Sequence, residues 1–359
     1  MAPIPELDFQ TDTADYERWL RQQCQVVEPD LAYKHTKMRT DPFVFLRATY
    51  YRWATGIERL LPELRGAPAV LAVGDAHTEN FGTWRDADGR LVWGINDFDD
   101  AATMPYPFDL VRLATSVRLI AGLDINNHDV ADALLKGYRR GLTRPRPALL
   151  DEGAVALRSI TVPTDTDRDA FWVEVAGYAD AAPPANAEAA LRASLPPAAA
   201  IVRFASRRKG SGGLGRPRYV AIAAWQGGQL VREAKALVAS AWDWAHEQAH
   251  VPSQYMPAST GRYRSPDPFL GVDGGYVVRR VAADADKLDL AELHGPGLTL
   301  RLLVAMGWDI GAIHAADPAA AAIGPHLDRQ PPGWLHDAAK RAAAAVQQDF
   351  LAWQRVPPG

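Results

Sequence analysis

The sequence has a single cysteine, Cys24, among its 359 residues. No disulfide can therefore form within the chain, and a metal site built on cysteine thiolates is excluded. No run of about 18 apolar residues occurs, so the sequence predicts no membrane-spanning helix and no membrane partner. Residues 1–18 are acidic and lack an apolar stretch, so we expect no secretory signal peptide and a cytoplasmic location.

The chain also lacks the excess of basic residues that is typical of nucleic-acid-binding proteins. Its formal net charge is −4, from 39 Lys and Arg against 43 Asp and Glu, so we expect no nucleic-acid partner. One local basic run, Arg207-Arg208-Lys209, either attracts polyphosphate or is a solvated charged segment. Apolar residues are plentiful at 48%, which is enough for a substantial core in two domains or lobes.

Residue periodicity predicts an α+β protein whose first half is mostly helical around a small hairpin. Helices are expected over 14–26, 42–61, 108–123, from 127 onward, and over 237–248, 298–315 and 335–356. Strands are expected over 70–73, 81–84, 91–95, 201–206, 218–225, 229–235 and 276–281. The Ala- and Pro-rich stretch 181–200 indicates a lobe boundary or linker, unless it is an ordinary helix and loop.

The first group of chemistry-bearing residues lies in Val73-Gly-Asp-Ala-His-Thr-Glu-Asn80 and Ile95-Asn-Asp-Phe-Asp-Asp100. The hairpin between these segments, turning at Asp-Ala-Asp-Gly, brings Asp75, Asn80 and Asp97 to one mouth. A carboxylate can orient the attacking hydroxyl, while an Asn oxygen and a second Asp can hold Mg²⁺ against nucleotide phosphates. Each residue alone would also suit a turn, but the ordered set favours function.

The second group is the run Gly210-Ser211-Gly212-Gly213-Leu214-Gly215. Such a run is a dinucleotide fingerprint, a loop that covers phosphates, or a flexible turn. A dinucleotide fingerprint should open a helix, whereas Pro217 and the β-branched residues after it predict a strand. A glycine loop between two strands can cover phosphates, because glycines let the backbone approach closely. Lys235, at the end of the next strand, would pair with those phosphates or be a solvated strand-end lysine.

Several other residues are weaker candidates. Glu247 is the candidate carboxylate partner of Lys235, whereas Glu233 lies only two residues from that lysine on the same strand. His77, two residues after Asp75, either lines the catalytic mouth or is a hydrogen-bonded loop histidine. Three arginines could contact phosphate or an acidic substrate through their guanidinium groups: Arg47, Arg279 and Arg280. The alternative is that they form surface salt bridges.

The segment Gly74-Asp75 with Asn80, then a hairpin and Asp97-Phe98-Asp99, resembles the catalytic loop and metal segment of aminoglycoside phosphotransferases and protein kinases. The resemblance implies a catalytic base at Asp75 and magnesium ligands at Asn80 and Asp97, with Asp99 beside them. Pro107-Phe-Asp-Leu110 resembles the phosphotransferase segment whose Asp braces the catalytic loop. Those families usually have His before Gly-Asp, and Val73 stands there instead, a departure that concerns the bracing more than the chemistry.

The order of the two groups is reversed relative to those families, in which the glycine loop and the lysine come first. Circular permutation would explain this order. The helix expected over 298–315, which ends Ile310-Gly-Ala-Ile-His314, resembles the family helix that leads into the catalytic loop. The chain would be cut between that helix and the loop, with a new join near 181–200.

The whole arrangement resembles a bacterial family named domain of unknown function 2252. The residues that carry this resemblance are Lys37-Met38, Asp41-Pro-Phe-x-Phe-Leu-Arg47, Gly74–Gly82, Asn96-Asp-Phe-Asp99, Gly210–Gly215, Lys235, Asp267-Pro-Phe-Leu-Gly271, Tyr276-Val-Val-Arg279 and Gly311-Ala-Ile-His314. The resemblance implies a circularly permuted, two-lobe, protein-kinase-like fold. Residues 1–190 would form the helical lobe with the catalytic loop, 191–285 a small antiparallel-sheet lobe that binds the nucleotide, and 286–359 helices returning to the first lobe.

We therefore predict an enzyme that uses ATP and Mg²⁺ to phosphorylate a hydroxyl of a small molecule or peptide. Transfer of AMP would use the same residues. A metal-dependent phosphohydrolase would also suit Gly-Asp-x-His, but the histidines elsewhere form no ordered ligand motif. The alternative outside enzymes is a pseudokinase-like binding module or scaffold. The oligomeric state does not follow from the sequence.

Overall fold

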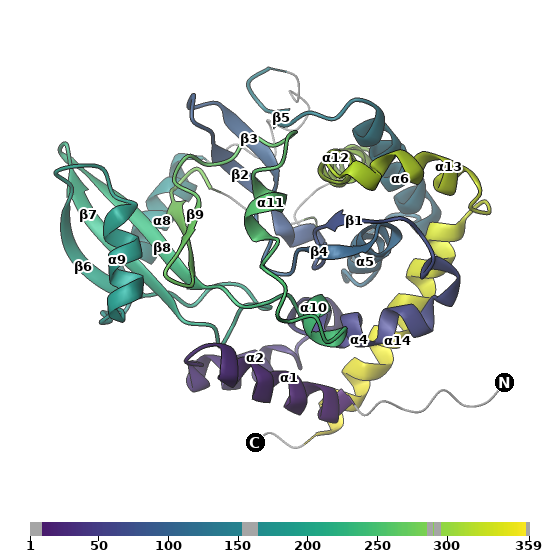
Figure 1. Ribbon diagram of the computed structural model, residues 1–359, viewed down its shortest axis with the longest axis horizontal. Helices are drawn as coiled ribbons and strands as arrows, with labels where there is room; N and C mark the ends of the chain where they lie inside the picture. The colour runs from purple at the N-terminus through teal and green to yellow at the C-terminus, as the bar shows by residue number, and fades with distance from the viewer. Residues whose placement is uncertain (1–8, 153–163, 286–289, 291–295, 357–359) are drawn as a thin grey trace.

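The computed structural model describes residues 9–152, 164–285, 290 and 296–356. This part of the chain contains thirteen α-helices and three antiparallel sheets of two, three and five strands (Figure 1). The mixture agrees with the α+β class expected from the sequence. Some boundaries and several short elements differ from expectation.

Four helices form the N-terminal region: α1 (Phe9–Gln23), α2 (Glu28–Lys37), α3 (Pro42–Ala48) and α4 (Tyr50–Leu60). The 3₁₀ turn η1 (Pro62–Leu64) follows them. The single helix expected over 42–61 is wrong, because Thr49 leaves the helical region with φ −125° and ψ 40° and separates α3 from α4. Asp41 caps α3 by accepting hydrogen bonds of 2.9 Å from the amides of Phe43 and Val44.

The expected hairpin is present at the centre of the fold. Strands β2 (Phe81–Arg85) and β3 (Leu91–Ile95) pair antiparallel, and β5 (Ala148–Leu149) adds a third strand. Gly89 in the turn has φ +75°, the left-handed region that Asp-Gly turns require. Strand β1 (Ala69–Ala72) pairs with β4 (Ala102–Pro105), and the 3₁₀ turn η2 (Thr78–Asn80) leads into β2.

Most other helices pack around these strands: α5 (Pro107–Arg118), α6 (Asn127–Thr143), α12 (Pro296–His314), η4 (Pro318–Ala322), α13 (Ile323–Asp328) and α14 (Trp334–Arg355). Helices α6 and α12 approach backbone to backbone through glycines. A Cβ at Gly137 would overlap the carbonyl oxygen of Val304, and a Cβ at Gly307 would overlap that of Leu134. The absence of side chains at these positions therefore allows the close crossing.

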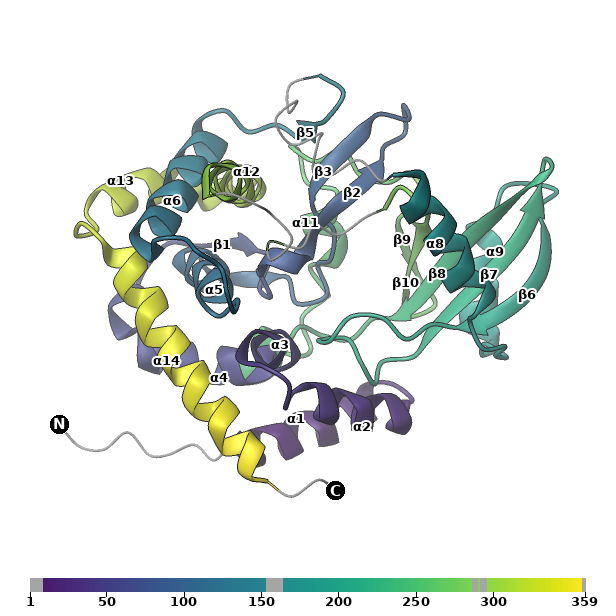
Figure 2. The same cartoon turned by 180° about the vertical axis from the view of Figure 1, so that it is seen from behind.

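The five-stranded sheet has the order β6 (Ala200–Ser206), β7 (Arg218–Trp225), β8 (Gly228–Ala236), β10 (Tyr276–Val281) and β9 (Gly271–Asp273). Helix α9 (Ala185–Ala193), inside the Ala- and Pro-rich stretch, packs on one face through Ala187, Ala190 and Leu191. Helix α8 (Asp165–Ala176) packs on the other face, where Val175 joins apolar side chains of β7, β8 and β10. Figure 2 shows the two helices on opposite faces of this sheet.

Two short helices connect β8 to β9: α10 (Ala241–Ala245) and α11 (Tyr255–Ser259). The helix expected over 237–248 is thus wrong at both ends. The Leu237 amide donates to Gly275 at 2.9 Å, which continues the extended chain past β8. Glu247 follows α10 with φ +58°, so it does not lie on a helix.

The five-stranded sheet with α8 and α9 lies at one end of the molecule, and α5, α6, α12, α13 and α14 lie at the other (Figures 1 and 2). The hairpin β2–β3 and helix α11 lie between them. No single described helix is long and apolar enough to cross a membrane, and α12 would reach that length only together with 318–328, to which it is bent by 117°.

Candidate functional site

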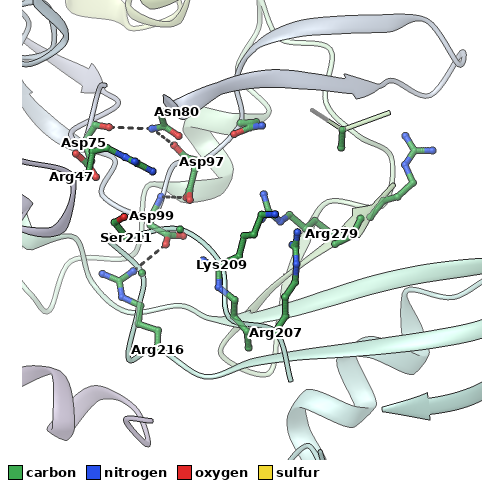
Figure 3. A pocket seen from close by; sticks show the side chains of 18 of the residues that line it. Arg47, Asp75, Asn80, Asp97, Asp99, Arg207, Lys209, Ser211, Arg216 and Arg279 are labelled. Atoms are coloured by element: carbon green, nitrogen blue, oxygen red, sulfur yellow. Dashed lines mark hydrogen bonds and ion pairs between the residues drawn. The ribbon is translucent and has the colours of Figure 1, made fainter. Parts of the chain in front are cut away.

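A cavity of about 380 Å³ lies where the glycine loop (residues 210–215) meets residues 73–80, the predicted catalytic loop, which is called the catalytic loop below. Figure 3 shows side chains from both loops, from the segment after β3 and from the five-stranded sheet converging on it. Of the residues predicted to form the site, those that line the cavity are Asp75, His77, Asn80, Asp97, Asp99, Gly210, Ser211, Gly212 and Gly213.

The catalytic loop is held by a buried carboxylate from α5. Asp109 is fully buried and accepts hydrogen bonds from the amides of Val73 at 2.7 Å and Gly74 at 2.9 Å. His314, the last residue of α12, places Nε2 3.0 Å from the same carboxylate. The loop is therefore braced as expected for Asp109, and a histidine enters from α12, whereas the position directly before Gly-Asp holds Val73.

Asp75, the predicted base, is paired with an arginine that the sequence did not single out. Arg112 is fully buried and donates from Nε to Oδ1 of Asp75 at 2.7 Å, and it also donates to the carbonyl of Leu46. Its guanidinium lies 4.7 Å from the ring centre of Tyr50. Burial raises the pKa of Asp75, and the positive charge of Arg112 opposes that rise. Arg112 holds Oδ1, and the other oxygen lies 3.8 Å from His77 Nε2.

Asn80 connects the catalytic loop to the segment after β3. Its Nδ2 donates to the backbone carbonyls of Asp75 and Asp97, both at 3.1 Å. Both donated bonds come from the amide nitrogen, so the side-chain oxygen is left for a ligand. This tie places Asn80 and Asp97 side by side, as the hairpin predicted.

Lys235 reaches the acidic segment from β8. Its Nζ lies 3.3 Å from Oδ2 of Asp97 and forms a second ion pair with Asp99. Arg216 also contacts Asp99, at 3.2 Å. Burial and the neighbouring Asp97 raise the pKa of Asp99, and the two cations oppose that rise. The expected alternative of a solvated lysine is wrong, because Lys235 is 4% exposed. Its partners are aspartates, and Glu247 lies elsewhere.

The residues present fit a magnesium ion bound together with phosphate. No group of three or more His, Cys, Asp or Glu side chains in the described ranges is arranged to hold a metal by itself. Magnesium is usually held by one or two carboxylates, with phosphate and water oxygens completing the octahedron. Asp97 and the Asn80 oxygen could supply the protein ligands, and Asp99 would do so only after leaving its two cations.

The glycine loop lies directly on these residues. A Cβ at Gly212 would lie 2.9 Å from the backbone oxygen of Arg47 and 3.5 Å from Oδ2 of Asp75, and one at Gly213 would lie 3.3 Å from Nζ of Lys235. Gly215 has φ +92° and its carbonyl accepts from the Val27 amide at 2.9 Å. Residues more than a hundred positions apart in the sequence therefore form one site.

A second charged group lines the same cavity and was missed as a group. Glu233, completely buried, accepts from Arg207 at 2.8 Å, from Arg279 at 3.0 Å and from Arg218 at 3.3 Å. Arg47 pairs with Glu79 at 2.6 Å, so Arg47 and Arg279 both form salt bridges, as the alternative expected, although Arg47 is buried. Arg207 is not part of a solvated run, because its side chain is 9% exposed and paired with Glu233. The strand register signals part of this cluster, since Arg279 lies opposite Glu233 in the β8–β10 pair.

Comparison with known proteins gives one family. Residues 26–152 match the model of the family described as "Uncharacterized protein conserved in bacteria (DUF2252)". The match covers the catalytic loop, the hairpin and α5, and it supports the family name inferred from the sequence. No curated protein and no solved structure matches the chain.

Proposed function

We propose that the chain is an ATP- and Mg²⁺-dependent phosphotransferase of the kinase-like type, acting on a hydroxyl of a small molecule or peptide. The observation that carries the proposal is the meeting of both predicted groups in one cavity. Residues 210–213 of the glycine loop line it together with Asp75, Asn80 and Asp97, and Lys235 forms an ion pair with Asp97. These are the components that phosphoryl transfer uses for phosphate contact, metal binding and orientation of the nucleophile.

The proposed fold is a circularly permuted kinase-like fold. A contact between the end of α12 and the strand before the catalytic loop, where the permuted chain would be cut, supports it. Asp317, just after α12, accepts a 2.8 Å hydrogen bond from the amide of Leu71 in β1. The end of α12 therefore lies beside the strand that leads into the catalytic loop, although some 250 residues separate them along the chain. Joining these two ends would restore the order in which the helix precedes the loop.

Each side chain has a role in this mechanism. Asp75 would accept a hydrogen bond from the acceptor hydroxyl through Oδ2, because Arg112 holds Oδ1. Lys235 and the backbone of Gly212 and Gly213 would contact the phosphates. Asn80 and Asp97 would hold Mg²⁺, which would supply positive charge against the phosphates. Orientation by a base of this type contributes about 10²–10⁴-fold, and positioning with charge neutralisation would supply the rest.

The cavity also has an apolar wall that suits a nucleobase. Phe171 of α8 lines the cavity, as do Val281 at the end of β10 and, after it, Ala282, Ala283 and Ala285. Base recognition generally combines such apolar surfaces with backbone polar groups.

The test is calorimetric titration of ATP with and without Mg²⁺. We expect magnesium-dependent binding in the wild type that weakens at least about tenfold, or 1.4 kcal/mol, in Asp97→Asn and in Lys235→Ala. Asp124→Asn and Lys136→Ala, two exposed changes outside the cavity, are matched controls and should bind as the wild type does. Absence of nucleotide binding under all conditions would refute the proposal. If ATP does bind, analysis of the reaction products would distinguish transfer of the phosphoryl group from transfer of AMP.

A pseudokinase-like binding protein is the second candidate, and specific ion pairs favour it. Asp75 is paired with Arg112, and Asp97 and Asp99 are paired with Lys235, so the groups required for chemistry already neutralise one another. Magnesium-dependent ATP binding without turnover, against a broad panel of hydroxyl acceptors, would favour this function. Turnover that Asp75→Asn abolishes while ATP affinity is retained would exclude it.

A further inference from the structure

The cavity holds a second group of charges, a cluster of three arginines around one carboxylate, which the proposed mechanism does not use. The arginine cluster consists of Arg207, Arg218 and Arg279 with Glu233. The sheet places them on one face, because Arg279 lies opposite Glu233 and Arg218 lies opposite Lys235 in the strand pairs. Figure 3 shows Arg207 and Arg279 converging beside Asp97 and Asp99, with Lys209 next to them.

The cluster has more N–H donors than its carboxylates accept. Each guanidinium carries several N–H donors in a fixed fork, whereas Glu233 offers only two oxygens. Glu174 of α8 adds a partner for Lys209 at 2.9 Å and lies 3.6 Å from Arg207, and the negative charge of Asp97 also acts on Arg279. The charges on this wall are therefore largely offset, and the surplus is one of hydrogen-bond donors.

Burial makes a donor without an acceptor costly. Arg218 and Glu233 are buried, and the side chain of Arg207 is 9% exposed, with its buried Nε making no hydrogen bond among the described residues. Burial alone would raise the pKa of Glu233, but the three arginines outweigh it and hold that pKa well below its ordinary value. An anion in the cavity would give such a donor an acceptor, since buried unsatisfied donors are unfavourable.

We propose that the arginine cluster binds a phosphate group of the ligand that accepts the transferred phosphoryl group, so the acceptor is itself a phosphorylated small molecule. Glu233 holds the guanidinium groups apart and oriented, and the incoming phosphate takes the N–H groups that face the cavity. The role of this phosphate as part of the acceptor rests on the proposed function. The anion site itself does not.

The spacing on β8 defines the class of acceptor. Glu233 and Lys235 are two residues apart on one strand, so their side chains lie about 6–7 Å apart along it. A phosphate at the cluster would therefore lie about that far from the phosphate held by Lys235. A three-carbon chain or a sugar ring carrying both a hydroxyl and a phosphate fits this separation.

The test uses tripolyphosphate without metal as the probe and isothermal titration as the readout. We expect binding to the wild type that falls about 10- to 100-fold in Arg207→Gln, as for loss of hydrogen bonds to a charged group. Asp97→Asn should retain this binding. Glu233→Gln should strengthen it, because a competing carboxylate is removed. Arg192→Gln, an exposed change at an ion pair on the opposite face of the sheet, is the matched control.

Several outcomes would overturn the inference. If tripolyphosphate affinity fell in Lys235→Ala but not in Arg207→Gln, the anion would bind at the glycine loop instead. Tighter binding of citrate than of tripolyphosphate would overturn the assignment to phosphate. If Glu233→Gln fails to fold, as far-ultraviolet circular dichroism would show, Arg207→Gln decides alone, since Glu233 keeps two arginine partners there. Metal-free anion binding without any ATP binding would refute the kinase proposal and leave the anion site standing.

Discussion

Lys34 of α2 lies beneath the glycine loop, and replacing it with methionine should stabilise the protein at neutral pH. Its Nζ is 3.5 Å from the carbonyl oxygen of Gly212 and 5.5 Å from the ring centre of Tyr51, and the residue is 3% exposed. Burial lowers its pKa to about 8, although the negative charges of Glu17, Asp100 and Asp75 favour the charged form. A long hydrogen bond and a ring therefore only partly replace the water that the ammonium loses.

The size of the destabilisation by Lys34 follows from the difference between its pKa values in the folded and unfolded states. A pKa of about 8 against the ordinary lysine value of 10.5 corresponds to about 3 kcal/mol. Below pH 8 both states bind the proton, and the full cost of burying the charge is present. Between pH 8 and about 10.5 the unfolded state binds more protons than the native state, so the free energy of unfolding rises with pH. Lys34→Met removes this dependence of stability on pH and replaces the lysine with an unbranched side chain of similar length.

We expect Lys34→Met to be about 1–3 kcal/mol more stable than the wild type at pH 7, with the difference shrinking toward zero by pH 10. Urea unfolding at several pH values measures the free energy of unfolding of both proteins. Subtracting one from the other cancels the contributions of the other titrating groups. Lys37→Met, on the same helix and less buried, is the matched control and should show no such convergence. A Lys34→Met protein that is less stable at pH 7 by an amount independent of pH would refute the reasoning.

Three further substitutions test other parts of the site. Arg112→Lys keeps a charge but loses the fork on Asp75, so the acidic limb of the pH–rate profile should move to higher pH, as measured by the pH dependence of kcat/KM. Asp109→Asn removes the carboxylate that accepts from Val73 and Gly74; it should cost about 3 kcal/mol and increase hydrogen exchange at those two amides, and unchanged exchange would contradict the bracing. Gly307→Ala should cost about 2–3 kcal/mol in urea unfolding because its Cβ would overlap Leu134, whereas Gly324→Ala, with nothing near its Cβ, should be neutral or slightly stabilising.

The sequence predicted those parts of the fold and site that depend on local patterns. The hairpin β2–β3 and the strands β7, β8 and β10 follow from alternation and turn residues, and the structure confirms them. Asp75, Asn80 and Asp97 were brought together correctly because a hairpin of short length limits where its two ends can lie. Lys235 was expected to pair with phosphates and with Glu247, so its ion pairs with Asp97 and Asp99 were not predicted.

Features fixed by tertiary contacts were not predictable in the same way. The break at Thr49 and the extended chain after Lys235 override a local helical pattern. The pairing of Arg112 with Asp75 joins α5 to the catalytic loop, and nothing near Arg112 in the sequence indicates a carboxylate partner. The arginine cluster likewise needs the strand register of β7, β8 and β10, which single-strand periodicity does not define.

The packing of α12 links the stability of the fold to the geometry of the catalytic loop. Gly307 and Gly311 let α12 approach α6 closely, and this approach positions His314 at the end of α12. His314 places Nε2 3.0 Å from Asp109, and Asp109 holds the amides of Val73 and Gly74 that precede Asp75. A displacement of α12 would therefore reach Asp75 through His314 and Asp109 without a substitution at any residue that lines the cavity. Gly307→Ala combined with Asp109→Asn should then be less destabilising than the sum of the two changes, because each disturbs the same contact, whereas additive effects would show that the helix crossing and the loop are independent.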